Sequence, residues 1–280
     1  MRDTKKMSPS PLLKSLFSRR HILALLATIP AAMASARAES RPIRVGILSG
    51  EDEDIWRIVQ ENALLAGLTI DVVTFSEGSP IDAALAAGDL DANAFQHGPY
   101  LHAQNTALGS HIVPAGNTYF APIGFYSNKW KSVSSLPEGA TIGVPADPTN
   151  EGRALKLLQS LGLLKIASGA GEMPTALDIA ENPKNLTIKE LDDPILARSL
   201  SDLDAGVVIT EWAYKAGIDL KKELLARESM ENNPYINFIA VNEDHAHAPW
   251  VQPLVRAFQQ PNVRAKLIEI YHGAIIPSWT

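Results

Sequence analysis

The sequence predicts an α/β protein of two lobes joined by a two-strand hinge. A strand, a helix and a second strand follow one another in residues 43–75, and the same alternation returns in residues 141–210. Alternation at this spacing indicates parallel sheets covered by helices. Strand-like segments at 123–127 and 236–241 stand between the two regions. The chain therefore crosses between the regions twice, and we expect the two crossings to form a hinge.

The first lobe begins with a βαβ unit. Residues 43–48 are β-rich, and the four acidic residues at 51–54 suit the positive end of a helix dipole. A helix is therefore predicted from residue 51 to Gly67, followed by a strand over 69–75. The other elements expected in this lobe are a helix over 80–87, a strand over 90–95, a loop over 96–100, and terminal helices over 250–259 and 263–271.

The second lobe repeats the α/β pattern. A strand over 141–145 is followed by a turn and by a helix from Gly152 onward, for which Thr149 or Asn150 is a natural N-cap. The remaining predicted elements are a short helix over 172–181 and strands over 187–191 and 205–210 that bracket another helix. We place lobe 1 at 39–124 plus 235–280 and lobe 2 at 125–234.

The N-terminus has the pattern of a secretory signal peptide. Basic residues precede a mostly apolar run at 22–34, and an Ala-Arg-Ala segment ends at Ala38. Cleavage is predicted near Ala38, which makes residues 1–38 the signal peptide. The apolar run is shorter than the roughly 18 residues that a membrane span needs. Arg19 and Arg20 resemble a twin-arginine export motif, although adjacent arginines occur in other signals too.

Composition excludes several classes of function. The net charge is −6 with interleaved signs, so the chain has no basic stripe for nucleic acid. It has no cysteine, which excludes disulfides, thiolate metal sites, thiol nucleophiles and a lipid-carrying N-terminal Cys. The common enzyme and nucleotide motifs are missing. His245 and His247 have no evident third metal ligand. We expect no cofactor, no metal and no enzymatic activity.

The residues around Arg153 form the first candidate site. Arg153 lies in the first turn of a predicted helix, and a helix start with an Arg side chain is a good receptor for a carboxylate. His97 and Tyr100 provide aromatic rings with polar tips in the preceding lobe, as a site for a small zwitterion requires. The alternatives are an ordinary surface Arg in a weak ion pair and a pair of buried loop aromatics.

Four segments resemble the methionine-binding lipoproteins of the NlpA type, and the resemblance extends over essentially the whole mature chain. They occur in the family's order and are, in this sequence, DANAFQHGPYL at 91–101, DPTNEGRAL at 147–155, ENPKNL at 181–186 and PYIN at 234–237.

The resemblance implies the two-lobed periplasmic binding protein fold, type II-like. It also implies capture of methionine, its D-isomer or a methionine-containing peptide for an ABC importer, with the permease and its ATPase as partners and a monomer as the default state. Arg153 would hold the ligand carboxylate, His97 and Tyr100 would contact the ligand, and Asn237 would add a polar contact at the hinge. Tyr119 falls where the family places an aromatic residue against the ligand side chain.

The chain departs from the family pattern in two ways. Family members usually carry a lipid on a Cys after the signal peptide, and this chain has none. We therefore expect it to be free in the periplasm. The family typically has an Asn after the strand at 205–210, and matching Tyr214 and the residues after it to the family puts Glu211 at that position. A carboxylate there would attract a ligand ammonium and repel a second ligand carboxylate.

Two other functions stay open on sequence alone. The first is a periplasmic α/β enzyme that uses Glu211 or His97 as a general base on a small amino-acid-like substrate. The second is a ligand sensor that kept the fold and lost transport. For the binding function, the sequence predicts that Arg153→Ala weakens binding and leaves the melting temperature of the ligand-free protein nearly unchanged.

Overall fold

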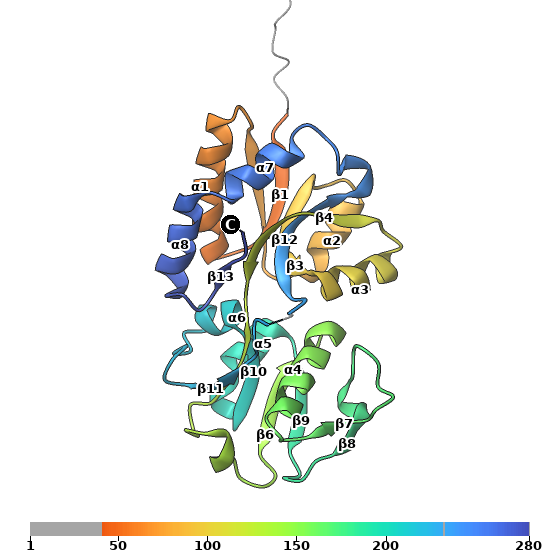
Figure 1. Ribbon diagram of the computed structural model, residues 1–280, viewed down its shortest axis with the longest axis vertical. Coiled ribbons are helices and arrows are strands. Elements are labelled where there is room, and N and C mark those ends of the chain that lie inside the picture. Colours follow the sequence, from red (N-terminus) through yellow and green to blue (C-terminus); the bar gives the residue numbers. More distant parts are fainter. Residues whose placement is uncertain (1–40, 232, 280) are drawn as a thin grey trace, which may run out of the picture. The chain divides into compact units, whose positions relative to one another are not determined.

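Two β-sheets organise the chain (Figure 1). The computed structural model describes residues 41–231 and 233–279, and the predicted signal peptide lies outside them. The strand order of the first sheet is β13 (Ile276–Pro277), β4 (Ile112–Phe120), β12 (Ile236–Asn242), β3 (Ala92–His97), β1 (Ile43–Leu48) and β2 (Ile70–Phe75). That of the second is β11 (Leu224–Arg227), β5 (Ile123–Tyr126), β10 (Ala205–Ile209), β6 (Thr141–Pro145) and β9 (Thr187–Leu191).

Lobe 1 is the part of the chain built on the six-stranded sheet. Strand β1 pairs in parallel with β2 and β3, which confirms the predicted βαβ unit. Its helices are α1 (Glu51–Leu65), α2 (Ser79–Ala86), α3 (Gly98–Leu108), α7 (Val251–Phe258) and α8 (Pro261–Tyr271). Helices α1, α7 and α8 pack together on one side of the sheet, with Trp56 against Phe258 at 5.6 Å between ring centroids (Figure 1). The N-terminal and C-terminal parts of the chain thus share one core.

Lobe 2 is built on the five-stranded sheet. Strand β6 pairs in parallel with β9 and β10, while β5 and β11 are antiparallel. Three helices belong to it, α4 (Pro148–Ser160), α5 (Asp193–Arg198) and α6 (Thr210–Lys215), together with a hairpin of β7 (Lys165–Ile166) and β8 (Ile179–Glu181). None of the helices in residues 41–231 and 233–279 combines the length and the apolar character that crossing a membrane requires.

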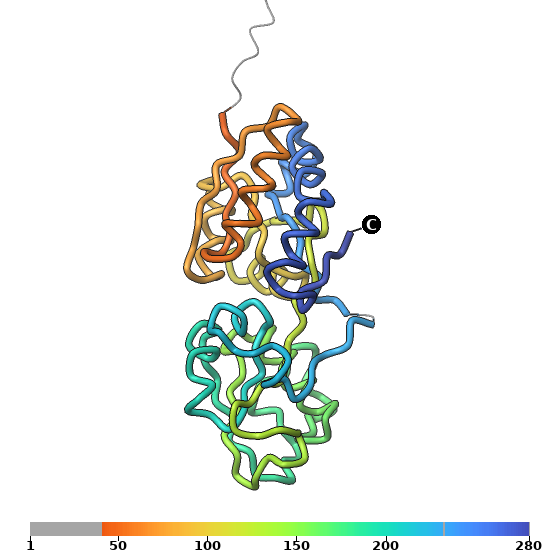
Figure 2. The backbone as a smooth tube through the Cα atoms, turned by 90° about the vertical axis from the view of Figure 1, so that its left-hand side faces the viewer, coloured from red at the N-terminus to blue at the C-terminus, as the bar shows by residue number. Residues whose placement is uncertain are grey.

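Two connections join the lobes. Strand β4 ends at Phe120 and β5 begins at Ile123, so the first crossing lies just before the expected lobe limit at residue 124. The return lies between β11 and β12, where 234 was the expected limit. Figure 2 shows both connections passing between the lobes on the same side. The backbone N–H of Ile123 donates to Glu228 Oε1 at 2.7 Å and ties the two connections together.

Three local predictions were wrong. The segment after His97 is not a loop but the start of α3, because Pro99 fits the first turn of a helix, where its missing N–H costs no hydrogen bond. The helix expected over 172–181 is a single 3₁₀ turn at Ala176–Asp178 followed by β8. The N-cap of α4 is Asp147 and neither Thr149 nor Asn150, because helical geometry already begins at Pro148.

Candidate ligand-binding site

A cavity of about 150 Å³ lies where the two sheets face each other. Its walls come from the segments that follow the carboxyl ends of β1, β2 and β3 in lobe 1 and of β6, β9 and β10 in lobe 2, the usual position of ligand sites in parallel α/β sheets. The lining residues are Leu48, Glu77, Gly78, Ser79, Phe95, Gln96, His97, Tyr100, Ala121, Asp147, Asn150, Arg153, Asp192, Asp193, Pro194, Ile209, Glu211, Trp212 and Asn237.

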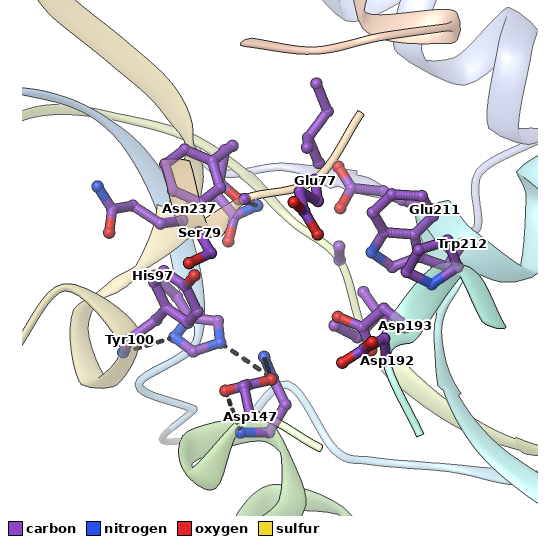
Figure 3. Close-up of a pocket in the computed structure, with 18 of the residues that line it drawn as sticks. Glu77, Ser79, His97, Tyr100, Asp147, Asp192, Asp193, Glu211, Trp212 and Asn237 are labelled. Atoms are coloured by element: carbon purple, nitrogen blue, oxygen red, sulfur yellow. Dashed lines mark hydrogen bonds between the residues drawn. The ribbon is translucent and has the colours of Figure 1, made fainter. Parts of the chain in front are cut away.

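His97 ends β3 and forms one wall of the cavity (Figure 3). Its Nδ1 accepts a hydrogen bond from the Tyr100 backbone N–H at 3.2 Å, so the ring proton is on Nε2. Nε2 donates to Asn150 Oδ1 at 3.0 Å, which links lobe 1 to lobe 2. Burial and, secondarily, the positive charge of Arg153 lower the pKa of His97 to about 3. The imidazole is therefore neutral at physiological pH and acts as a fixed donor.

Tyr100 and Asn237 stand beside His97. The Tyr100 ring meets Phe95 edge to face, with centroids 5.7 Å apart, and burial raises the pKa of its hydroxyl, which keeps the proton. Asn237 pairs with His97 across β12 and β3 and donates to the Phe95 carbonyl at 3.4 Å. Apolar rings with a few polar groups are thus arranged as in a small-molecule site.

Arg153 lies one turn into α4 with 3% of its surface exposed. Its Nε and Nη2 donate to both oxygens of Glu228, and Nη2 also donates to the Ala121 carbonyl at 2.9 Å. The guanidinium stacks over the Tyr235 ring at 4.2 Å. Nη1 has only a long contact, 3.4 Å, with Asn150 Oδ1. Arg153 therefore has an ion-pair partner in the protein, and Nη1 is the donor atom that remains for another group.

The start of α4 is already capped by the protein itself. Asp147 Oδ1 accepts from the backbone N–H groups of Thr149 and Asn150 at 3.2 and 3.0 Å, and Oδ2 accepts from the Asn150 side chain at 2.9 Å. The N–H groups of Thr149 and Asn150 are thus already bound within the protein, so of the predicted carboxylate receptor only the Arg153 side chain keeps a donor for another group. Asn150 is held in place to meet His97.

Glu211 reaches the cavity from the first turn of α6, and 4% of its surface is exposed. Its Oε1 accepts a short hydrogen bond from the Tyr119 hydroxyl, again between the two lobes. Burial raises the pKa of Glu211. Tyr119 itself is buried and does not line the cavity, so it contacts Glu211 from behind instead of contributing to the wall.

The cavity thus gathers five of the six predicted site residues, His97, Tyr100, Arg153, Glu211 and Asn237. Sequence reasoning missed Asp193, Trp212 and the partner of Arg153, Glu228. Asp193 and Trp212 carry a usable signal, because each follows the carboxyl end of a predicted parallel strand. Glu228 has none, since only the fold brings it to Arg153. Among the described residues no three acidic or His side chains are gathered to hold a metal ion.

Comparison with known proteins finds relatives of this chain. A family model described as NlpA lipoprotein matches residues 43–279. The D-methionine-binding lipoprotein MetQ of Escherichia coli (strain K12) is 40% identical over 240 residues, 85% of this chain and 88% of that protein. Lipoprotein 28 of the same strain is 36% identical over 245 residues, 86% of this chain and 90% of that protein.

Solved structures agree over the same extent. A nutrient-binding protein from Burkholderia cenocepacia bound to methionine has a TM-score of 0.82 and 46% identity, covering 85% of this chain and all of that one (100%). A periplasmic substrate-binding protein of an ABC transporter from Coxiella burnetii has a TM-score of 0.80 and 39% identity, covering 84% of this chain and 100% of its own. The predicted two-lobed fold class is confirmed.

Proposed function

We propose that this chain, which belongs to the NlpA lipoprotein family, is a periplasmic substrate-binding protein that delivers a small ligand to an ABC importer. The ligand class is methionine or a related amino acid or small peptide. The observation that carries the proposal is the cavity between the lobes, which is lined by the His97 and Tyr100 rings of lobe 1 and by Arg153 of lobe 2. It is supported by the relative from Burkholderia cenocepacia, whose structure holds methionine.

The proposed site residues contact different parts of the ligand from the two lobes. Arg153 offers Nη1 to the ligand carboxylate, while the Glu228 pair holds the guanidinium in a fixed orientation. Asn237 and the Tyr100 hydroxyl contribute polar contacts from lobe 1. Hydrogen bonds to a charged ligand group are each worth about 1.5–3 kcal/mol. The contacts of the ligand with both lobes therefore favour the closed arrangement over an open one.

The neutral His97 holds Asn150 in place and forms an uncharged part of the cavity wall, and it does not act as a base. Because its pKa is about 3, it neither carries a charge that would compete with Arg153 nor takes a proton from a substrate near pH 7. Tyr119 acts on the ligand through Glu211, whose carboxyl it orients. We propose binding without turnover, so a bound amino acid or peptide is recovered unchanged.

The finer parts of the proposal concern the chain as a whole. Its signal peptide is removed near Ala38. The mature protein is free in the periplasm because no Cys is present to carry a lipid. It works as a monomer with a permease and an ATPase. The proposed lobe limits are 39–124 plus 235–280 and 125–234. Passage through the twin-arginine route is tested by replacing Arg19 and Arg20 with Lys and measuring export.

The decisive experiment combines native mass spectrometry of the exported protein with calorimetric titration of L-methionine, D-methionine and glycyl-methionine. We expect a retained small ligand and submicromolar binding of at least one of the three. Asn237→Ala should weaken that binding roughly tenfold or more, at about 1.4 kcal/mol per factor of ten. Asn128→Ala, at an exposed turn outside the cavity, is the matched control and should bind normally. Absence of binding to amino acids and peptides would refute the proposal.

A further inference from the structure

The cavity carries more negative than positive side chains. Arg153 is the one Lys or Arg among its described lining residues, and Glu228 already neutralises it. The acidic lining residues are Glu77, Asp147, Asp192, Asp193 and Glu211. Asp147 is compensated by the N–H groups at the start of α4. Glu77 and Asp192 are exposed to solvent, which screens them. Glu211 and Asp193 remain without a matching positive charge in the wall.

These two side chains are built into the site. Asp193 begins α5 after β9, Glu211 lies in the first turn of α6 after β10, and both strands flank β6. Figure 3 shows them on the same side of the cavity, opposite His97 and Tyr100. Asp193 Oδ1 is shielded from solvent and has no hydrogen-bond partner among the described residues. Glu211 is nearly fully buried, and its hydrogen bond within the part of the chain that the structure describes, from Tyr119, is on Oε1.

A third buried carboxyl interacts with Glu211. Asp52 in α1 is 3% exposed, and burial together with the charge of Glu211 raises its pKa to about 8. Burial and then Asp147 raise the pKa of Asp193 to about 8 as well. The opposing charges are Lys215, which acts on Asp52 and Glu211, and Arg153, which acts on Glu211 and Asp193. Asp52 and Asp193 are therefore mostly protonated near pH 7.

Charge balance then bears on the kind of ligand. A zwitterionic amino acid adds no net charge to the cavity, and the Arg153–Glu228 pair adds none either. Glu211 is buried and Asp193 is half-buried with its Oδ1 shielded from solvent, so ionisation of both around such a ligand leaves a charge without a partner. A ligand with a second positive group brings one net positive charge, which compensates one of the two carboxylates, and a charge-assisted hydrogen bond or a close ion contact then stabilises that carboxylate.

We propose that Glu211 and Asp193 form a cation subsite and that the protein prefers amino-acid ligands with a positively charged side chain over neutral ligands of the same size. This inference rests on the proposed function, because it specifies the ligand for the same cavity. The subsite would take an ammonium or a sulfonium group, while Arg153 holds the carboxylate at the other end.

The test compares two probes with the same number of non-hydrogen atoms. S-methyl-L-methionine carries a permanent positive charge on sulfur, and L-ethionine is neutral there. We expect calorimetry at pH 7 to show at least tenfold tighter binding of the sulfonium. Titration in two buffers of different ionisation enthalpy should show that proton release accompanies binding of the sulfonium and not of ethionine. In the variant Glu211→Gln/Asp193→Asn the ratio of the two dissociation constants should fall close to one, whatever the absolute affinities, and in each single variant the ratio should fall part of the way.

The matched control removes the same two charges elsewhere. Glu61→Gln/Asp71→Asn changes exposed residues of α1 and β2 outside the cavity and should keep the tenfold preference. Circular dichroism establishes that every variant is folded. Equal or tighter binding of ethionine by the wild-type protein overturns the cation subsite while leaving methionine-class binding intact. A preference for the sulfonium that survives in the double variant overturns the subsite in the same way. If neither probe nor methionine binds, the proposed function fails and the cation subsite fails with it.

Discussion

Replacing Arg153 with Ala tests whether this residue serves only ligand binding or also stabilises the fold. Arg153 is 3% exposed, and its fork spans Glu228 of the return connection and the Ala121 carbonyl of the first crossing. The truncated side chain leaves Glu228 without its cation. It also removes the stacking on Tyr235. The structure therefore predicts a loss of stability that the sequence alone did not.

The magnitude follows from the partners that remain. Removing one partner of a buried ion pair costs about 3–5 kcal/mol. The Glu228 side chain is 11% exposed and keeps hydrogen bonds from the Ile123 N–H and from Asn233 Nδ2, so the lower end, about 3 kcal/mol, applies. For a chain of this length each kcal/mol shifts the melting temperature by about 2–4 °C. The ligand-free variant should melt roughly 6–12 °C below the wild-type protein.

The assay is thermal unfolding of ligand-free protein followed by circular dichroism. Arg153→Ala/Glu228→Ala should recover part of the loss, because it removes the unpaired charge as well. Arg198→Ala, at an exposed position at the end of α5, is the control and should stay within about 0.5 kcal/mol of wild type. A normal melting temperature for Arg153→Ala together with lost binding would refute this account and restore the expectation from sequence.

Three further predictions concern titration and capping. His97 has a pKa of about 3 in the fold against an ordinary 6.5, so its contribution to stability is lost as the pH falls below 6.5. The loss reaches about 2 kcal/mol at pH 5. His97→Gln should flatten this decline in the free energy of unfolding, measured in urea between pH 7 and 5. Asp52 has a pKa of about 8 against 3.8, so stability is lost as the pH rises from about 4 to 8; Asp52→Asn should raise the melting temperature at pH 8.5 and leave it unchanged at pH 4. Asp147→Ala should lower the free energy of unfolding by about 0.5–2 kcal/mol, measured with denaturant, because α4 loses its N-cap. Asn at this position can still accept the capping hydrogen bonds, so an equal loss in Asp147→Asn would contradict that reason.

The sequence predicted those parts of the fold that depend on local pattern. The β1–α1–β2 unit follows from a buried strand, an acidic first turn and a second strand, and β6 with α4 follows from the same signals. Helix α3 was missed because Gly98 and Pro99 also suit a loop. The supposed helix over 172–181 was wrong because the carboxylate of Asp178 caps a single turn at Thr175 and the chain then extends.

The candidate site was predicted as far as its residues lie in recognisable segments. His97 and Arg153 come from two such segments, and the cavity brings them together. The pairing of Arg153 with Glu228 spans 75 residues and depends on where the two connections pass each other, which no local pattern encodes. The place of Tyr119 behind Glu211 has the same origin. Its ring is buried in the β4 segment, and only the packing of α6 against that segment gives the hydroxyl a partner.

The position of β12 between β3 and β4 has a consequence for the order in which the two lobes can fold. The sheet of lobe 1 lacks an inner strand until residue 242 has been made, and α1 lacks its packing partners until α7 and α8 follow. All five strands of the lobe 2 sheet lie within 123–227, so that lobe is complete about fifty residues before the end of the chain and can form without the segment that follows. A nascent chain interrupted before residue 236 would therefore present one finished lobe and one open sheet, and the binding cavity comes into existence only with the final segment of the polypeptide.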